Sequence, residues 1–103
     1  MEPVILTHGG AASPSKNADG CVLAAEAARA VLAAGGDALA AALAATAMLE
    51  DDPRFNAGTG SNLRLDGGVI EMDAAVMVSD GRFGAVPILP DETEMLQTVV
   101  HAQ

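Results

Sequence analysis

Few side chains in this sequence could make or break a bond unaided. His8 and His101 are the only imidazoles and Cys21 is the only thiol, and no Gly-x-Ser-x-Gly nucleophile elbow accompanies them. His8 closes an apolar run, so we expect backbone groups to satisfy its ring. Cys21 stands near a predicted helix start, where a thiol can be activated, although a packed, inert thiol is the simpler interpretation. None of these residues makes a self-sufficient active site.

Carboxylates form two groups that could bind a cation or act as an acid pair. Glu50, Asp51 and Asp52 are consecutive, while Glu71 and Asp73 are two residues apart in a strand-like segment and would share one side of it. Divalent-metal binding needs carboxylates converging from several elements. The simpler alternatives are a solvated helix end for Glu50 and Asp51, and a solvated sheet face or a hydrogen-bonded aspartate for the second group.

The segment Gly58-Thr59-Gly60-Ser61 has the glycine content of a phosphate-binding loop. However, the lysine of a P-loop is missing, and position 63 is leucine where a dinucleotide fingerprint has glycine. A strand-like segment follows instead of a helix whose N-terminus could hold phosphate. These differences disfavour nucleotide binding.

The composition describes one small acidic domain or a piece of a larger one. The chain has 103 residues, 14 Asp and Glu against 5 Lys and Arg, and a net charge of -9. Without a basic cluster, neither nucleic acid nor an anionic membrane surface is an expected partner. The longest apolar stretch, residues 38–49, is too short for a bilayer, which needs roughly 20 residues. One cysteine cannot form an internal disulfide, and we expect a cytoplasmic protein.

Small-residue helices are predicted for the first half, after a short strand. Residues 3–8 form an apolar run that predicts a strand buried on both faces and ending at Gly9-Gly10. Asp19 is the predicted cap of a helix over about 20–34, which Gly35-Gly36 ends. Asp37 is the predicted cap of a second helix that reaches about Glu50. Their alanine-rich faces predict close packing in an enclosed layer.

Hairpin signals dominate the second half. Asp66-Gly67 separates strand-like residues 63–65 from 68–78, and Asp80-Gly81 precedes a further strand over 82–86. A last apolar-periodic stretch covers 95–100. The fold class is therefore α+β, with an antiparallel sheet and paired helices on one face.

Two segments are more specific: Thr7-His8-Gly9-Gly10-Ala11 and the stretch from Leu49 to Ser61, which contains Phe55-Asn56-Ala57-Gly58. They resemble the plant-type (type 2) L-asparaginase and isoaspartyl peptidase family of threonine N-terminal nucleophile (Ntn) hydrolases. Shorter matches follow in the same order: Gly35-Gly36-Asp37-Ala38, Glu71-Met72-Asp73-Ala74 with Met77, and Gly84-Ala85-Val86. Each match alone is weak, whereas the ordered set, running over residues 4–86, is specific.

The resemblance implies a four-layer αββα Ntn-hydrolase sandwich made by autoproteolysis of a precursor. In this family a threonine freed at the new N-terminus attacks the substrate amide, with its own α-amine as base. Every threonine here is internal, so the resemblance implies that residues 1–103 are the α-subunit part of one domain, incomplete without a β subunit that carries the nucleophile. The expected assembly is a dimer of αβ units. The expected reaction is hydrolysis of the asparagine side-chain amide or of β-aspartyl (isoaspartyl) peptide bonds in small molecules and dipeptides.

Functional residues are carried over only where the motifs match. Asn56 matches an asparagine that supports the nucleophile, and Gly9 and Gly10 match a turn that packs behind the processed peptide. No cofactor is required, but the loop matches one that wraps a monovalent cation, usually Na⁺, with main-chain oxygens. The expected carbonyl ligands are Leu49, Glu50, Asp52, Phe55, Ala57 and Thr59. Without the resemblance, residues 55–58 would be interpreted as an Asx-stabilised turn with a packed ring.

The family pattern breaks after Val86. Residues 87–94 are shorter than in the family, Pro90 limits ladder pairing, and no cleavage site follows. The alternative hypothesis is therefore a truncated, non-catalytic relative that acts as a structural or binding module.

Overall fold

The computed structural model describes residues 2–60 and 72–89, which fall into two compact units divided after Leu49. The first unit holds a short 3-10 helix η1 (Ser15–Asn17) and two helices, α1 (Ala18–Ala33) and α2 (Ala38–Asp51), the last two residues of which enter the second unit. The second unit holds a loop over residues 52–60 and two strands, β1 (Met72–Met77) and β2 (Phe83–Leu89). Among the described residues, no helix is long and apolar enough to cross a membrane.

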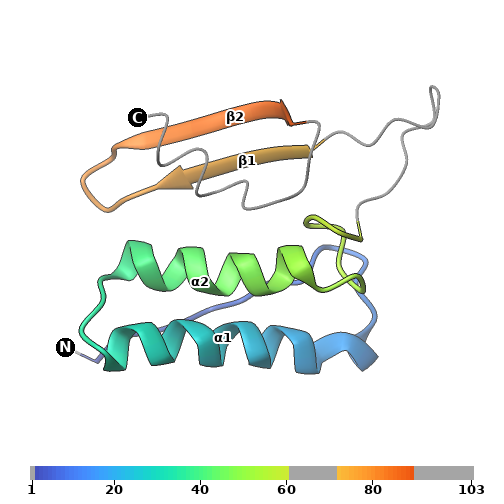
Figure 1. The fold of residues 1–103 in the computed structure, drawn as a ribbon, viewed down its shortest axis with the longest axis horizontal. Helices are drawn as coiled ribbons and strands as arrows, with labels where there is room; N and C mark the ends of the chain where they lie inside the picture. Colours follow the sequence, from blue (N-terminus) through green and yellow to red (C-terminus); the bar gives the residue numbers. More distant parts are fainter. Residues whose placement is uncertain (1, 61–71, 90–103) are drawn as a thin grey trace. The chain divides into compact units, whose positions relative to one another are not determined.

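Alanine methyl groups form the core of the first unit. Helices α1 and α2 run antiparallel, side by side (Figure 1). Ala24, Ala28, Ala41 and Ala45 are at most 7% exposed and form one cluster. They recur every four residues, so each helix turns one narrow stripe of small side chains inward. The predicted close packing of alanine faces is confirmed.

The helix ends follow local rules with one exception. The Asp37 carboxylate accepts a hydrogen bond from the Ala40 N–H at 2.8 Å, which confirms it as the cap of α2. After α1, the N–H groups of Gly35 and Gly36 donate to carbonyls one turn back, and Gly35 has a φ of +93°. The prediction that Asp19 caps α1 is wrong, because η1 runs directly into the helix and places Asp19 in its first turn.

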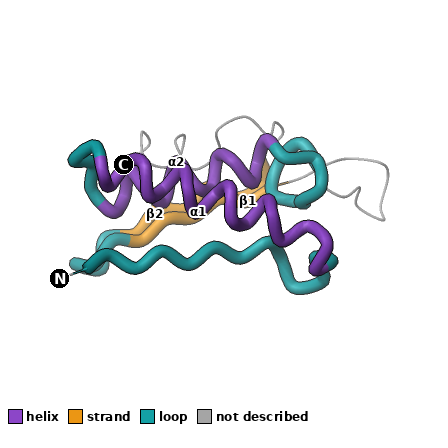
Figure 2. Tube along the Cα trace, turned by 90° about the horizontal axis from the view of Figure 1, so that it is seen from below, coloured by secondary structure: helices purple, strands orange, loops and turns teal. Residues whose placement is uncertain are grey.

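Residues 3–8 form an extended segment that lies along the helices (Figure 2). Ile5 packs on the alanine cluster, and the Thr7 hydroxyl donates a hydrogen bond to the Cys21 carbonyl at 2.9 Å. On the other side Val4 is 92% and Leu6 94% exposed. The prediction of a strand buried on both faces is therefore wrong within the described residues: the alternation of side chains is present, but only one face is covered.

The strands of the second unit form an antiparallel hairpin, as predicted at Asp80-Gly81. Gly81, with a φ of +90°, donates its N–H to the Val78 carbonyl at 2.9 Å, and the Val78 N–H donates to the Arg82 carbonyl at 3.0 Å. The register pairs Ala75 with Ala85. The predicted strand 82–86 is longer than expected, and its ladder shifts by one residue beside Pro87, which has no N–H to contribute.

Both strands have a covered and an open side. Ala74 is buried and Val76 and Gly84 are half-buried, whereas the alternate residues Ala75, Met77, Phe83 and Ala85 are exposed. The predicted strand 63–65, the Asp66-Gly67 turn, the segment 87–94 beyond Leu89 and the apolar stretch 95–100 lie outside the described residues.

Candidate functional site

The loop that follows α2 contains most of the predicted site residues. At its start, Glu50 is only 3% exposed and its carbonyl oxygen accepts the Thr59 N–H at 2.8 Å. This hydrogen bond closes a loop of ten residues against the last turn of the helix. The prediction of a solvated helix end is wrong for Glu50 and holds for Asp51, which is exposed.

Asp52 folds the chain back immediately after the helix. Its carbonyl accepts the Phe55 N–H at 3.1 Å, and its carboxylate accepts the Arg54 N–H at 3.0 Å. The Phe55 ring that follows is 3% exposed. A packed ring and an Asx turn were both expected for this motif, but the residue that forms the described Asx turn is Asp52.

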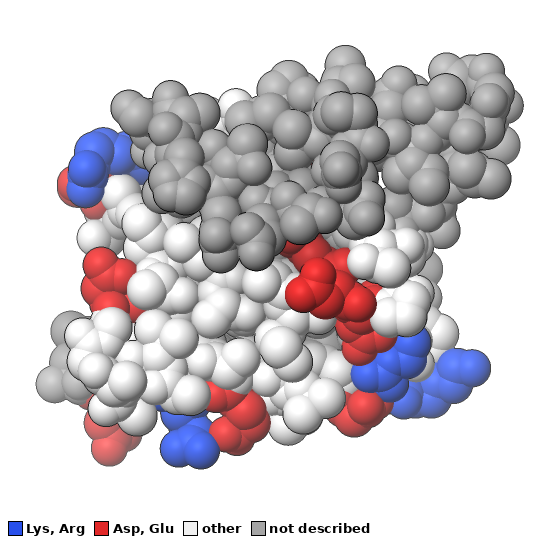
Figure 3. All heavy atoms as spheres, in the orientation of Figure 1, with Lys and Arg blue, Asp and Glu red and all other residues white. Residues whose placement is uncertain are grey.

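The same carboxylate also holds the guanidinium of Arg54. Nη2 of Arg54 lies 2.8 Å from Oδ2 of Asp52, and Nε contacts both carboxylate oxygens at 3.1 and 3.2 Å. These hydrogen bonds to the charged form lower the pKa of Asp52 from its ordinary value of 3.8. Basic groups on the face drawn in Figure 3 likewise lie next to acidic ones. The carboxylate is therefore ionised at neutral pH.

Two glycines allow the returning chain to pass very close to this turn. A methyl group at Gly58 would lie 2.6 Å from the Glu50 carbonyl oxygen, and one at Gly60 would overlap the carbonyl oxygens of Pro53 and Phe55. Main-chain oxygens thus crowd around the returning segment, which is the donor type that hard cations such as Na⁺ accept. The Pro53 oxygen, which was not among the predicted ligands, lies against Gly60 together with that of Phe55.

The other predicted ligands take different places. Asp52 and Glu50 already accept one backbone N–H each, so each carbonyl keeps a second lone pair. Ala57 is half-buried and Thr59 is exposed, while Leu49 is the last residue of the first unit. The cation-binding role of these carbonyls stays a prediction. Among the described residues, no three His, Cys, Asp or Glu side chains gather into a metal site, and Glu71 lies outside them.

Asn56 is exposed, although it follows the buried ring of Phe55 directly. The turn at residues 52–55 therefore anchors one side chain and presents the next one outward. The supporting role of Asn56 stays a prediction.

The glycine turn of the first unit is built around His8. Its Nδ1 accepts the Gly10 N–H at 3.0 Å, and Gly10 has a φ of +109°, which favours glycine. The prediction that backbone groups satisfy this ring is confirmed, although His8 is exposed and does not end a buried strand. Gly9 is half-buried in the same turn, and its supporting role, like that of Gly10, stays a prediction.

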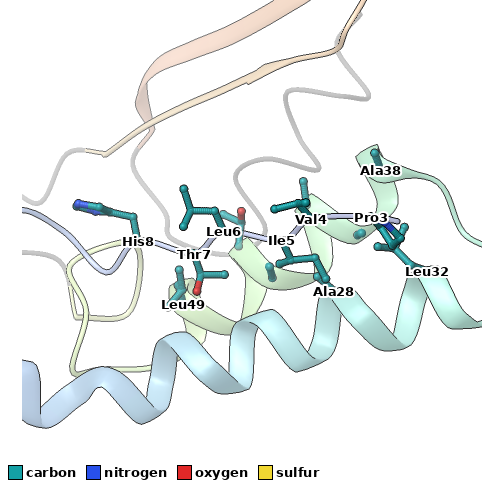
Figure 4. A pocket seen from close by; sticks show the side chains of 14 residues that line it. Pro3, Val4, Ile5, Leu6, Thr7, His8, Ala28, Leu32, Ala38 and Leu49 are labelled. Atoms are coloured by element: carbon teal, nitrogen blue, oxygen red, sulfur yellow. The ribbon is translucent and has the colours of Figure 1, made fainter. Parts of the chain in front are cut away.

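An apolar cavity of about 440 Å³ lies in the first unit, between residues 3–8 and the two helices (Figure 4). Ala28 and Leu32 line it from α1, and Ala41, Ala45 and Leu49 line it from α2. The Thr7 hydroxyl donates its hydrogen bond to the backbone carbonyl of Cys21. The lining also includes Thr46 and His8, and the Cys21 side chain is half-buried.

Comparisons with known proteins agree with the motifs. The model of a family described as "Asparaginase" matches residues 1–91. Similar proteins include isoaspartyl peptidase/L-asparaginase of Macaca fascicularis, 40% identical over 97% of this chain and 35% of its own length, and that of Danio rerio, 47% identical over 80% of this chain and 27% of its own. A plant-type L-asparaginase of Pyrococcus furiosus is 64% identical over 41% of this chain and 13% of its own length.

The order of motifs, the family match and these relatives agree on one family. The chain belongs to the plant-type asparaginase family. It spans about a third of the length of the mammalian relatives it matches.

Proposed function

We propose that this chain is the α-subunit part of an asparaginase and isoaspartyl peptidase, completed by a β part that carries an N-terminal threonine. The observation that carries the proposal is one of coverage: nearly the whole chain matches relatives named isoaspartyl peptidase/L-asparaginase, yet it matches only 35% of their length. Residues 1–103 then form one incomplete domain that works in the cytoplasm and assembles as a dimer of αβ units.

The reaction is hydrolysis of a side-chain amide or of a β-aspartyl peptide bond. The threonine hydroxyl of the β part attacks the amide carbon, its α-amine takes the proton and returns it to the departing ammonia or amine, and water then cleaves the ester to release aspartate. The residues of this chain do not attack the substrate. Asn56 orients the hydroxyl through its amide, and the Gly9-Gly10 turn supports the peptide that autoproteolysis cleaves.

The loop over residues 49–59 would hold a monovalent cation through its carbonyl oxygens. A bound Na⁺ would supply positive charge that fixes those oxygens in one arrangement. The crowding of the Glu50, Pro53 and Phe55 oxygens around Gly58 and Gly60 supports this part of the proposal. The site would be structural, and no chemical step depends on it.

Two uncovered apolar surfaces support a sandwich completed by further layers. Val4 and Leu6 are almost fully exposed in the first unit, and Met77 and Phe83 are 69% and 63% exposed in the second. Apolar side chains placed on one side of extended segments are typical of a sheet face that packs against a second sheet. We therefore place these surfaces in the interior of the αββα sandwich.

Assembly with a β chain provides the test. The chain is co-expressed with the threonine-headed β chain of a family member, and release of aspartate from a β-aspartyl dipeptide and from asparagine is measured. We expect turnover that is lost when the N-terminal threonine is replaced by alanine. An assembled pair without turnover would contradict the proposal and favour the alternative, a non-catalytic structural or binding module.

A pair of matched substitutions tests the sandwich separately. Leu6→Lys places a charge on the surface that we assign to the interior, so we expect it to abolish assembly with the β chain. Val22→Lys introduces the same charge on α1, where the side chain is 60% exposed, and should leave assembly intact. Equal assembly of the two variants, measured by size-exclusion chromatography, would contradict the sandwich.

A further inference from the structure

Arg54 lies in the loop of the candidate site and has no predicted role, yet Asp52 holds both its backbone and its side chain. The Asp52 carboxylate receives both the N–H and the guanidinium of Arg54, so one side chain fixes a backbone turn and a charged side chain together. A guanidinium that meets a carboxylate through two nitrogens is held in one orientation, unlike a point-charge contact.

Arg54 also reaches the next residue. Its guanidinium carbon lies 5.8 Å from the centre of the Phe55 ring, within the range of a cation–π contact. The Phe55 carbonyl oxygen in turn lies against Gly60, together with that of Pro53. The residues on either side of Arg54 therefore supply the two oxygens that meet the returning chain at Gly60, and Asn56 follows Phe55 immediately.

The hairpin contains a second Asp-x-Arg turn that shows what is particular to the first. Asp80 accepts the Arg82 N–H at 3.0 Å, and Nε of Arg82 lies 3.1 and 2.9 Å from its oxygens. In the hairpin, the Arg82 side chain is 78% exposed and that of Asp80 58%. In the site loop, the Arg54 side chain is 38% exposed and that of Asp52 20%. Exposed ion pairs contribute little, whereas a partly covered, two-nitrogen pair can hold a conformation.

We infer that Arg54 is a positioning residue: by bridging the Asp52 carboxylate and the Phe55 ring, it sets the carbonyl oxygens of Pro53 and Phe55 and the direction of Asn56. The inference deepens the proposed function, on which the role of Asn56 rests. It adds Arg54 to the site, and it makes the geometry of the site depend on a charged group outside the predicted ligands and catalytic residues.

Amide hydrogen exchange in the full chain tests this without relying on activity. Thr59, five residues after Arg54, donates its N–H to Glu50 and reports whether the loop is closed. In Arg54→Gln we expect this amide to exchange about tenfold faster, which corresponds to about 1.4 kcal/mol of opening free energy. Arg82→Gln removes the matched guanidinium from the hairpin and should leave the Thr59 rate unchanged. A change confined to residues 53–55 in Arg54→Gln would overturn the inference.

Kinetics of the assembled enzyme give the second readout. A positioning role predicts that Arg54→Gln lowers kcat about tenfold with KM nearly unchanged, since misplacing a supporting group raises the barrier without removing substrate contacts. Arg54→Lys keeps the positive charge but loses the two-nitrogen contact of the guanidinium, so we expect a similar fall in kcat. This variant replaces Arg54→Gln in the test if the glutamine variant does not fold. Wild-type kcat in both variants would overturn the inference. An inactive wild-type assembly would instead contradict the proposed function. The amide exchange rates would still test the positioning role of Arg54, because they do not depend on activity.

Discussion

Replacing Gly58 with alanine tests the packing of the site loop most directly. The added methyl group would lie 2.6 Å from the Glu50 carbonyl oxygen and 3.0 Å from the Glu50 Cβ, where ordinary contacts begin near 3.4 Å. The carbonyl must therefore retreat by about 0.8 Å, the difference between 3.4 and 2.6 Å. A movement of that size along the hydrogen bond from Thr59 would lengthen it from 2.8 to about 3.6 Å, which is no longer a hydrogen bond.

The energetic effect has three parts. Overpacking costs about 1–3 kcal/mol, and the lost hydrogen bond costs about 0.5–1.5 kcal/mol. Removing a glycine from the unfolded chain returns about 0.4–1 kcal/mol. We expect a net destabilisation of about 2 kcal/mol, or a fall in Tm of roughly 8–16 °C for a domain of this size.

Thermal unfolding followed by circular dichroism at a helix band is the assay, because the chain has no Trp or Tyr to report by fluorescence. Gly81→Ala is the control: it introduces a methyl group at a φ of +90° with no atom within 4 Å, so it strains the hairpin without touching the loop. Exchange of the Thr59 amide should accelerate only in Gly58→Ala. Wild-type stability together with a protected Thr59 amide in that variant would refute the steric reasoning.

Three further outcomes are expected. Asp37→Ala removes the carboxylate that accepts the Ala40 N–H and should destabilise the chain by about 1 kcal/mol in urea unfolding, with no change in the Thr59 amide; an unchanged midpoint would contradict its capping role. Asn56→Ala should impair processing or turnover of the assembled enzyme while its circular dichroism spectrum stays unchanged, whereas full activity would remove our assignment. Because the pKa of Asp52 is lowered in the fold, the stability it contributes is complete above its ordinary pKa of 3.8 and is lost as the pH falls through the lower, folded value. Measured as the free energy of unfolding against pH, this loss should appear in the wild type and not in Arg54→Gln. The same pH dependence in both proteins would contradict the prediction.

Local signals predicted the elements whose causes are local. Asp37 and Gly35-Gly36 mark the junction of the two helices because an N-cap carboxylate and a left-handed glycine act within a few residues. Asp80-Gly81 marks the hairpin for the same reason. Close packing of the two helices was also readable from their alanine-rich faces, whereas which alanines of α1 turn inward, Ala24 and Ala28, was not.

Features that depend on distant atoms were not readable. A continuous apolar run such as residues 3–8 predicts a strand with two apolar faces but not whether both are covered, and here Val4 and Leu6 are exposed. Glu50 looks like a solvated residue at a helix end, and only the hydrogen bond from Thr59 shows that the chain returns over it. The Asp52–Arg54 bridge had a usable sign in the Asp-Pro-Arg spacing, but its link to the Phe55 ring required coordinates.

The alanine cluster between α1 and α2 has a consequence for the lifetime of the chain in the cell. Methyl groups bury little area each, so the helix pair gains less from its interior than a leucine-filled layer would. Under the proposed function, an α part of this kind, made in excess of its β part, would open often enough to be degraded. Its abundance would then follow that of the β part. Degradation of the excess chain would balance the amounts of the two parts, even if they were made at different rates.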